Sequence, residues 1–288
     1  MGNDAQRQIG TEFVNQPLLP ANPAAALPFA QRDPYPSLVP TFQQVSNFQW
    51  SNYNAGYAKL EQRLKGGLSY IVSYTFSKCI DSASPSGNGQ NMYNRRLERA
   101  LCDTDVPNNF TGSYVLDLPF GRGRRFNIPY PVLNGFVGGW ELSGITSMIS
   151  GTPLTITTTG DIAEVGTGGQ RGNATGIAPS MLNPRTNGLK GFNTAAYAVP
   201  VTGTFGNLSR NTQRGFGIND WDMGINKNFA IRPLGEAGRL QIRAEFFNIW
   251  NHTQFSGVGT SVNQPATFGI VNSALSARIL QLAAKLYF

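Results

Sequence analysis

SARILQLAAKLYF, at residues 276–288, is the segment that decides the fold of this chain. Its side chains alternate along an extended strand, so that one face is apolar and the other is small or polar. The apolar row is Leu280, Leu282, Ala284, Leu286 and Phe288, and the opposite row is Gln281, Ala283, Lys285 and Tyr287. Such a strand, ending in an aromatic residue, is typical of transmembrane β-barrels, in which one row contacts hydrocarbon and the other contacts water. The segment therefore predicts an outer-membrane location.

The composition allows membrane strands but not membrane helices. Of the 288 residues, 40% are hydrophobic and only 14% are charged. The apolar residues are dispersed, and no run approaches the roughly 18 to 20 consecutive apolar residues that a spanning helix needs, whereas a strand needs only about ten. The 33 glycines, 10 tyrosines and 18 phenylalanines suit turns and the aromatic girdles of a barrel.

Further segments with a period of two precede the C-terminal strand, and the connections between them alternate between short and long. This pattern predicts an all-β fold, an antiparallel transmembrane β-barrel of which the chain supplies the C-terminal strands. The facing of the first segment is ambiguous, because Leu60 falls on the face opposite to Tyr53 and Tyr57. The seven segments are 48–63, 68–79, 109–118, 135–149, 221–229, 239–246 and 276–288.

The connections predict the sidedness of the sheet. Short turns near Gly66, Gly121 and Gly235 (the last within Arg232-Pro233-Leu234-Gly235) are expected on the periplasmic side, and long loops on the outside. Those long loops are 80–107, 150–220 and 251–275. Residues 1–47, which are rich in proline, are predicted to be an irregular external loop, and 48–288 to be one incomplete barrel domain. Because residues 1–10 carry no secretory signal, we expect a longer protein from which this piece comes.

The segment at 239–246 provides the main argument against a soluble β-sandwich. Leu240, Ile242, Ala244 and Phe246 alternate with a polar row, and charges in that row would be prohibitive in a dry core but tolerable in a wet lumen. We expect this row to face the lumen; it consists of Arg239, Gln241, Arg243 and Glu245.

These segments resemble the C-terminal barrel portion of TonB-dependent outer-membrane receptors, particularly the Oar-like group. The resemblance covers most of the chain. It rests on SNYNA at 51–55, LEQR at 60–63, GLSY at 67–70, YTFSK at 74–78, YVLDLPFG at 114–121, GWELSG at 139–144, SGTPL at 150–154 and EFFNIWNH at 245–252.

The resemblance implies a receptor that binds a small nutrient, an oligosaccharide or a peptide through its external loops and passes it through the lumen. Energy would come from the TonB system through a plug, which is not part of this sequence. The family implies about 22 strands around a plugged lumen, so that we expect seven strands not to close a barrel. The ending also resembles the signal read by the barrel-assembly machinery, carried by Gln281, Ala283, Leu286 and Phe288, with alanine at 283 where glycine is usual. Outer-membrane lipid is the other expected partner.

Few residues suggest further chemistry, and we expect no enzyme activity and no cofactor. Cys79 and Cys102 flank the first long loop and are candidates for a disulfide in an oxidising compartment, the alternative being two free thiols. His252, with Thr253 or Ser256 beside it, lacks the carboxylate and nucleophile elbow of a catalytic triad. Asp81, Asp103 and Asp105 could bind calcium, but their spacing does not match a calcium loop and solvated aspartates are the plainer interpretation. No metal site is therefore predicted.

The formal charge of +7 does not indicate a nucleic-acid partner, because the basic residues are scattered and the only dense group is Arg122, Arg124 and Arg125 in a glycine-rich turn. The tryptophans at 50, 140, 221 and 250 fall near strand ends, where membrane girdles lie. Two other functions stay open at this point. One is a soluble, secreted β-sandwich that binds carbohydrate, and the other is an outer-membrane barrel with a role in adhesion or assembly.

Overall fold

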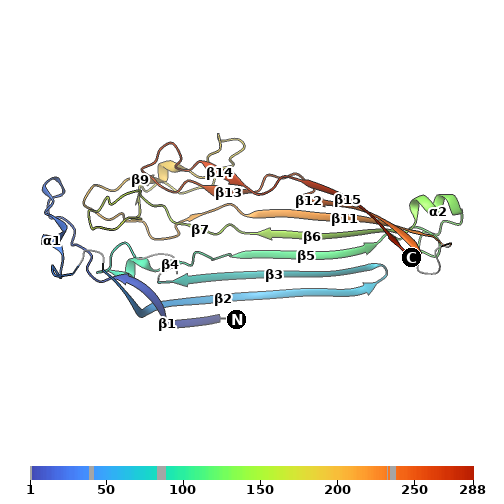
Figure 1. The fold of residues 1–288 in the computed structure, drawn as a ribbon, viewed down its shortest axis with the longest axis horizontal. Coiled ribbons are helices and arrows are strands. Elements are labelled where there is room, and N and C mark those ends of the chain that lie inside the picture. Colours follow the sequence, from blue (N-terminus) through green and yellow to red (C-terminus); the bar gives the residue numbers. More distant parts are fainter. Residues whose placement is uncertain (1, 39–41, 83–88, 232, 234–237) are drawn as a thin grey trace.

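A computed structural model describes residues 2–38, 42–82, 89–231, 233 and 238–288, which form one long antiparallel sheet with a cluster of loops at one end (Figure 1). The strand order is β1-β2-β3-β5-β6-β11-β12-β15, and β4 (Ala100–Leu101) adds to the end of β3. The long strands are β1 (Gly2–Phe13), β2 (Gln43–Lys65), β3 (Leu68–Asp81), β5 (Asn108–Asp117), β6 (Trp140–Ile149), β11 (Ile218–Ala230), β12 (Arg239–Phe247) and β15 (Ile279–Tyr287).

All seven segments predicted from the period of two lie in this sheet, so the predicted all-β fold is confirmed. Sequential strands are neighbours, as in an up-and-down meander. The turn between β2 and β3 is the two-residue hairpin at Gly66 and Gly67, whose φ angles of 64° and 87° require glycine. The turn predicted at 232–235 lies outside the described residues except for Pro233.

The connection at Gly121 is longer than predicted, because it contains a helix. Residues 118–139 join β5 to β6, and α2 (Pro131–Val137) lies within them. The segment predicted at 135–149 therefore begins as a strand only at Trp140. Pro131 at the start of α2 fits the first turn of a helix, where the missing amide hydrogen costs nothing.

The prediction that residues 1–47 are irregular is wrong for residues 43–47, which begin β2, and for residues 2–13. Residues 2–13 form β1, which pairs with β2 from Gly2 opposite Asn54 to Phe13 opposite Gln43. The sequence of β1 is mostly polar, with only Ala5, Ile9 and Phe13 as apolar residues, and the strand is held by its backbone pairing with the start of β2. Only residues 14–38 are largely irregular, with the short helices η1 (Pro23–Ala25) and α1 (Phe29–Arg32).

The register gives the sheet two chemically different faces. Between β12 and β15, Leu240 lies opposite Leu286 and Phe246 opposite Leu280, which makes continuous apolar rows on what we call the outward face. On the other face, Gln241 lies opposite Lys285 and Glu245 opposite Gln281. The ambiguity at Leu60 is resolved, since it pairs with Val72 on the outward face.

The apolar rows of the sheet are not covered by a second sheet. Leu282 is 72% exposed and Phe76 is 58% exposed. In contrast, all the buried hydrophobic residues in the described part of the chain lie outside the long strands: Cys102, Ile156, Ala163, Val165, Phe192, Ala196, Tyr197, Leu208, Val262, Phe268 and Val271. A sandwich would bury the strand leucines and phenylalanines, and the sandwich interpretation is therefore wrong.

No helix in the described ranges is both long enough and apolar enough to cross a bilayer.

Candidate functional site

The loops at one end of the sheet fold together into a structure that we call the external head, made of residues 14–38, 89–107, 150–217 and 248–278 (Figure 1). It contains three small two-stranded sheets and a hydrophobic core of its own. The small sheets pair β7 (Pro153–Leu154) with β10 (Gln213–Arg214), β8 (Asn173–Ala174) with β9 (Tyr197–Ala198), and β13 (Phe255–Val258) with β14 (Val271–Ala274). Two 3-10 helices, η2 (Arg95–Glu98) and η3 (Thr194–Ala196), complete the head.

The core of the head joins two loops that are distant in sequence. Phe192 is fully buried, and its ring packs edge to face against Tyr197 at 5.7 Å and Phe268 at 5.5 Å. Burial raises the pKa of Tyr197 to about 12, so its hydroxyl stays protonated and donates a hydrogen bond to Gln213 Oε1 at 2.8 Å. The full core cluster is Ile156, Phe192, Ala196, Tyr197, Leu208, Val262 and Phe268.

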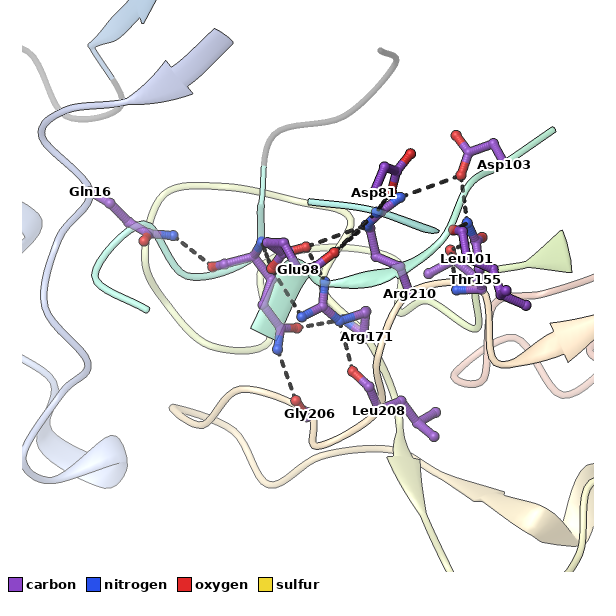
Figure 2. A network of polar contacts seen from close by, with 12 residues as sticks. Gln16, Asp81, Glu98, Leu101, Asp103, Thr155, Arg171, Gly206, Leu208 and Arg210 are labelled. Carbon is purple, nitrogen blue, oxygen red and sulfur yellow. Dashed lines mark hydrogen bonds and ion pairs between the residues drawn. The ribbon is translucent and has the colours of Figure 1, made fainter. Parts of the chain in front are cut away.

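A buried ion pair connects the first and second long loops (Figure 2). Arg171 binds Glu98 with both guanidinium nitrogens, at 2.7 and 3.0 Å, and the two side chains are only 3% and 4% exposed. Arg171 Nε also donates to the carbonyl of Leu208 at 2.8 Å. Gln90 lies beside the pair and accepts from the amide of Arg171 at 3.0 Å. A buried ion pair is stable only when its polar side-chain atoms have hydrogen-bond partners, and neither Arg171 nor Glu98 has a buried side-chain N or O atom without one.

The aspartates considered for calcium are instead bound by arginines. Arg210 pairs with Asp81 and lies 3.5 Å from Asp103, and Arg214 pairs with Asp105. In the part of the chain that the structure describes, no group of three or more His, Cys, Asp or Glu side chains is arranged to hold a metal ion. These carboxylates therefore act as anchors for the 150–217 loop rather than as a cation site.

The N-terminal segment is tied to the same network. Gln16 donates to the carbonyl of Gln90 at 2.9 Å, as Figure 2 shows, and its own oxygen accepts from the amide of Met92 at 3.0 Å. Arg32 donates at 2.7 Å to the carbonyl of Glu164. Three separate parts of the chain thus meet in one polar cluster, above the end of the sheet.

The structure joins Cys79 and Cys102 in a disulfide, with their Cα atoms 5.4 Å apart. Cys79 lies near the end of β3, and Cys102 follows β4. The bond therefore links the sheet to the first long loop at the point where Asp105 Oδ1 accepts from the amide of Cys79 at 2.6 Å.

Replacing both cysteines with serine is expected to destabilise the loop by about 3 kcal/mol, because a loop of this length gains that much entropy in the unfolded state. The measurement is cleavage of residues 89–101 by thermolysin in isolated outer membranes, compared with the wild type before and after reduction. Equal cleavage of the wild type and the double variant under oxidising conditions would contradict this. A thiol-reactive polymer should label the wild type only after reduction.

The polar face of the sheet carries a groove of about 520 Å³. Its lining includes the predicted row residues Arg243 and Glu245, which form an ion pair with each other, together with Glu61, Ser69 and Asp222. Arg239 and Gln241 lie on the same face by register, opposite Tyr287 and Lys285. The structure thus brings the four predicted residues to one face of β12.

The remaining predicted residues lie apart from this groove. His252 is in a turn, where its amide donates to Asn248 Oδ1 at 2.9 Å. Gln281 and Ala283 lie on the polar face of β15, Leu286 lies on the outward face, and Phe288 is 91% exposed. Trp140 lies at the turn end of the outward face and Trp221 at the loop end, where Trp221 packs against Trp250 at 6.5 Å. Trp140 lies opposite Lys227, which is six residues from Trp221 along β11. Six residues correspond to about 20 Å of strand, close to the height of a membrane band.

Sequence reasoning missed the residues that organise the head, namely Gln16, Gln90, Glu98, Arg171, Arg210 and Arg214. The amide of Gln90 donates to Glu98 Oε1 only eight residues away, but the contacts that join separate loops span between 73 and 129 residues along the chain. A weak signal was present in the composition, because these charges and amides occur in loops otherwise rich in glycine, asparagine and threonine.

A single antiparallel sheet with one apolar face, one polar face and long loops at one end defines a class of protein, the transmembrane β-barrels. The sequence model of the outer membrane beta barrel domain matches residues 1–281, and the chain belongs to that family. The protein is therefore located in the outer membrane. No curated protein and no solved structure matches the chain.

Proposed function

We propose that this chain supplies C-terminal strands and external loops to a TonB-dependent receptor of the Oar-like group, which binds a nutrient outside the cell and passes it through the barrel. The observation that carries the proposal is the external head. Long outside loops need no internal packing to anchor a barrel, yet these loops are held by a hydrophobic core, a disulfide and a buried ion pair. Rigid loops on a fixed scaffold are where binding specificity is usually built.

The polar face supports the same proposal. Its groove combines charged and hydroxyl side chains with apolar ones, namely Ile71, Val115, Ile145 and Phe247, as a surface that contacts both water and a substrate or plug could. The four residues Arg239, Gln241, Arg243 and Glu245 would then line the lumen. No catalytic role is part of the proposal, nor is any cofactor.

The test compares a deletion strain with the same strain carrying the wild-type gene, during growth on limiting oligosaccharide, peptide or ferric chelate. We expect loss of uptake of one of these classes, and the same loss when the TonB system is deleted in the wild type. A matched variant that disrupts the head, Glu98→Gln, should reduce uptake while the barrel remains in the membrane. Unchanged uptake of all three classes with loss of surface attachment would instead support a role in adhesion.

A further inference from the structure

The connection between β5 and β6 carries an exposed apolar surface at the end of the sheet opposite the head (Figure 1). Val132 is 76% exposed, Leu133 50% and Phe136 74%, and these three residues share one side of α2. Tyr130, which precedes the helix, is 70% exposed. Soluble surfaces rarely leave such a contiguous group uncovered.

The other side of α2 is already occupied. Asn134 Oδ1 accepts from the amide of Arg122 at 2.7 Å, and its position leaves no space for a side chain at Gly121 or Gly138. The helix is therefore fixed against its own preceding loop by its polar side. The apolar side is held away from that loop.

The C-terminal end of α2 is fixed on the outward face of the sheet. Trp140 Nε1 donates to the carbonyl of Phe136 at 2.8 Å, and Lys227 Nζ donates to the carbonyls of Phe136, at 3.1 Å, and Gly138. Trp140 and Lys227 are paired in the register and belong to the same outward row as Ile242 and Ala284. The helix thus adjoins the lipid-facing surface rather than the polar groove.

Lys227 provides a second argument that α2 lies beside the lipid-facing surface. A lysine on a lipid-facing row is costly unless its charge is covered or reaches the interface. Here the side chain is only 3% exposed, and Nζ lies 5.0 Å from the Trp140 ring and 5.1 Å from the Phe229 ring. Because α2 supplies the carbonyls that bind this ammonium group, helix and lysine form one unit at the edge of the hydrocarbon.

The charge of the segment favours an anionic surface. Residues 118–139 contain Arg122, Arg124 and Arg125 but no Asp or Glu. All three arginines are exposed, and only Arg124 is described with an acidic partner, Asp117 at 3.2 Å. A basic, apolar helix beside a membrane face is the arrangement of an interfacial anchor.

We propose that residues 119–138 lie in the membrane interface and bind anionic phospholipid of the periplasmic leaflet, with the apolar side of α2 among the acyl chains and the arginines at the headgroups. The leaflet follows from sidedness, since α2 lies at the same end of the sheet as the Gly66–Gly67 turn and the C-terminus (Figure 1). Barrels of this class place short turns in the periplasm and long loops outside.

The test uses spin labels on Val132→Cys and, as a matched control, Val201→Cys, in isolated outer membranes containing the full protein. Val132 and Val201 are similarly exposed, at 76% and 71%, but Val201 lies in the external head. The native cysteines are bonded to each other and do not take the label. The readout is the ratio of collisions with oxygen, which concentrates in hydrocarbon, to collisions with a polar nickel chelate.

We expect a several-fold higher oxygen-to-nickel ratio at position 132 than at position 201, and Leu133→Cys should repeat the result if the first variant assembles poorly. Adding Arg122→Gln and Arg125→Gln should lower the ratio at 132 without changing it at 201. Equal ratios at 132 and 201 would overturn the proposal, because α2 would then project into water. Spin–spin broadening between labels at 132 would also overturn it, in favour of contact between two copies of the chain.

Discussion

Replacing Glu98 with glutamine or Arg171 with methionine is expected to destabilise the external head by about 3–5 kcal/mol, because each change leaves a buried charge without its partner. The two side chains are 4% and 3% exposed, and both guanidinium nitrogens bind the carboxylate. Glu98 Oε2 also lies 3.7 Å from Arg210, which pairs with Asp81 at the end of β3, but the strands themselves are held by backbone pairing. The head should therefore open while the sheet stays in the membrane. The measurement is cleavage of the head by thermolysin in outer membranes, followed over a range of urea concentrations.

Arg124→Gln is the matched control for this prediction. Arg124 also bridges a carboxylate, that of Asp117 at 3.2 Å, but its side chain is 48% exposed and such pairs contribute about 0–1 kcal/mol. The double variant Glu98→Gln, Arg171→Met should cost less than the sum of the two single changes, because the charges are removed together. If both single variants resist thermolysin as well as Arg124→Gln does, the ion pair is not what holds the two loops together.

Phe192→Ala is expected to cost about 3–5 kcal/mol, because it removes a large, fully buried ring and leaves a cavity. Phe192 is 0% exposed and contacts Tyr197 and Phe268, so that its loss separates the second long loop from the third. Hydrogen exchange should accelerate at the amides of residues 156–208 and 258–268. The amides of β2 and β3 should remain protected.

Phe136→Ala provides the comparison at the other end of the sheet. The side chain of Phe136 is 74% exposed, and it lies far from the head. Its substitution should therefore change the stability of the head by less than about 0.5 kcal/mol. Faster exchange in β2 and β3 of the Phe192→Ala protein would mean that head and sheet unfold as one unit. The two-part description of the molecule would then be wrong.

Much of the sheet could be predicted from the sequence, because alternation is a local property. A strand places successive side chains on opposite faces, and six of the seven segments carry enough apolar residues on one parity to reveal their facing. Segment 48–63 was the exception. Its tyrosines and Leu60 compete for the same face, and only the pairing of Leu60 with Val72 decides between them.

Where the local pattern was absent, prediction failed. β1 is mostly polar, with Ala5, Ile9 and Phe13 as its apolar residues. It forms because the edge of β2 offers unpaired backbone groups, and this cannot be predicted from the sequence of β1 itself. α2 was missed because it has only seven residues and contains Gly135. Its position depends on the carbonyls of Phe136 and Gly138, which accept from Lys227 and, at Phe136, from Trp140 as well.

By itself the sequence determined the class of fold, the facing of most strands and the end of the sheet at which the long loops lie. The first two follow from alternation between neighbouring residues, and the third follows from the lengths of the connections. Only the tertiary structure decided how the head is held together and where α2 lies. Glu98 and Arg171 are 73 residues apart, and Arg210 and Asp81 are 129 apart. Contacts between residues so far apart depend on the tertiary fold of the whole chain, and they cannot be predicted from the spacing of residues along the sequence.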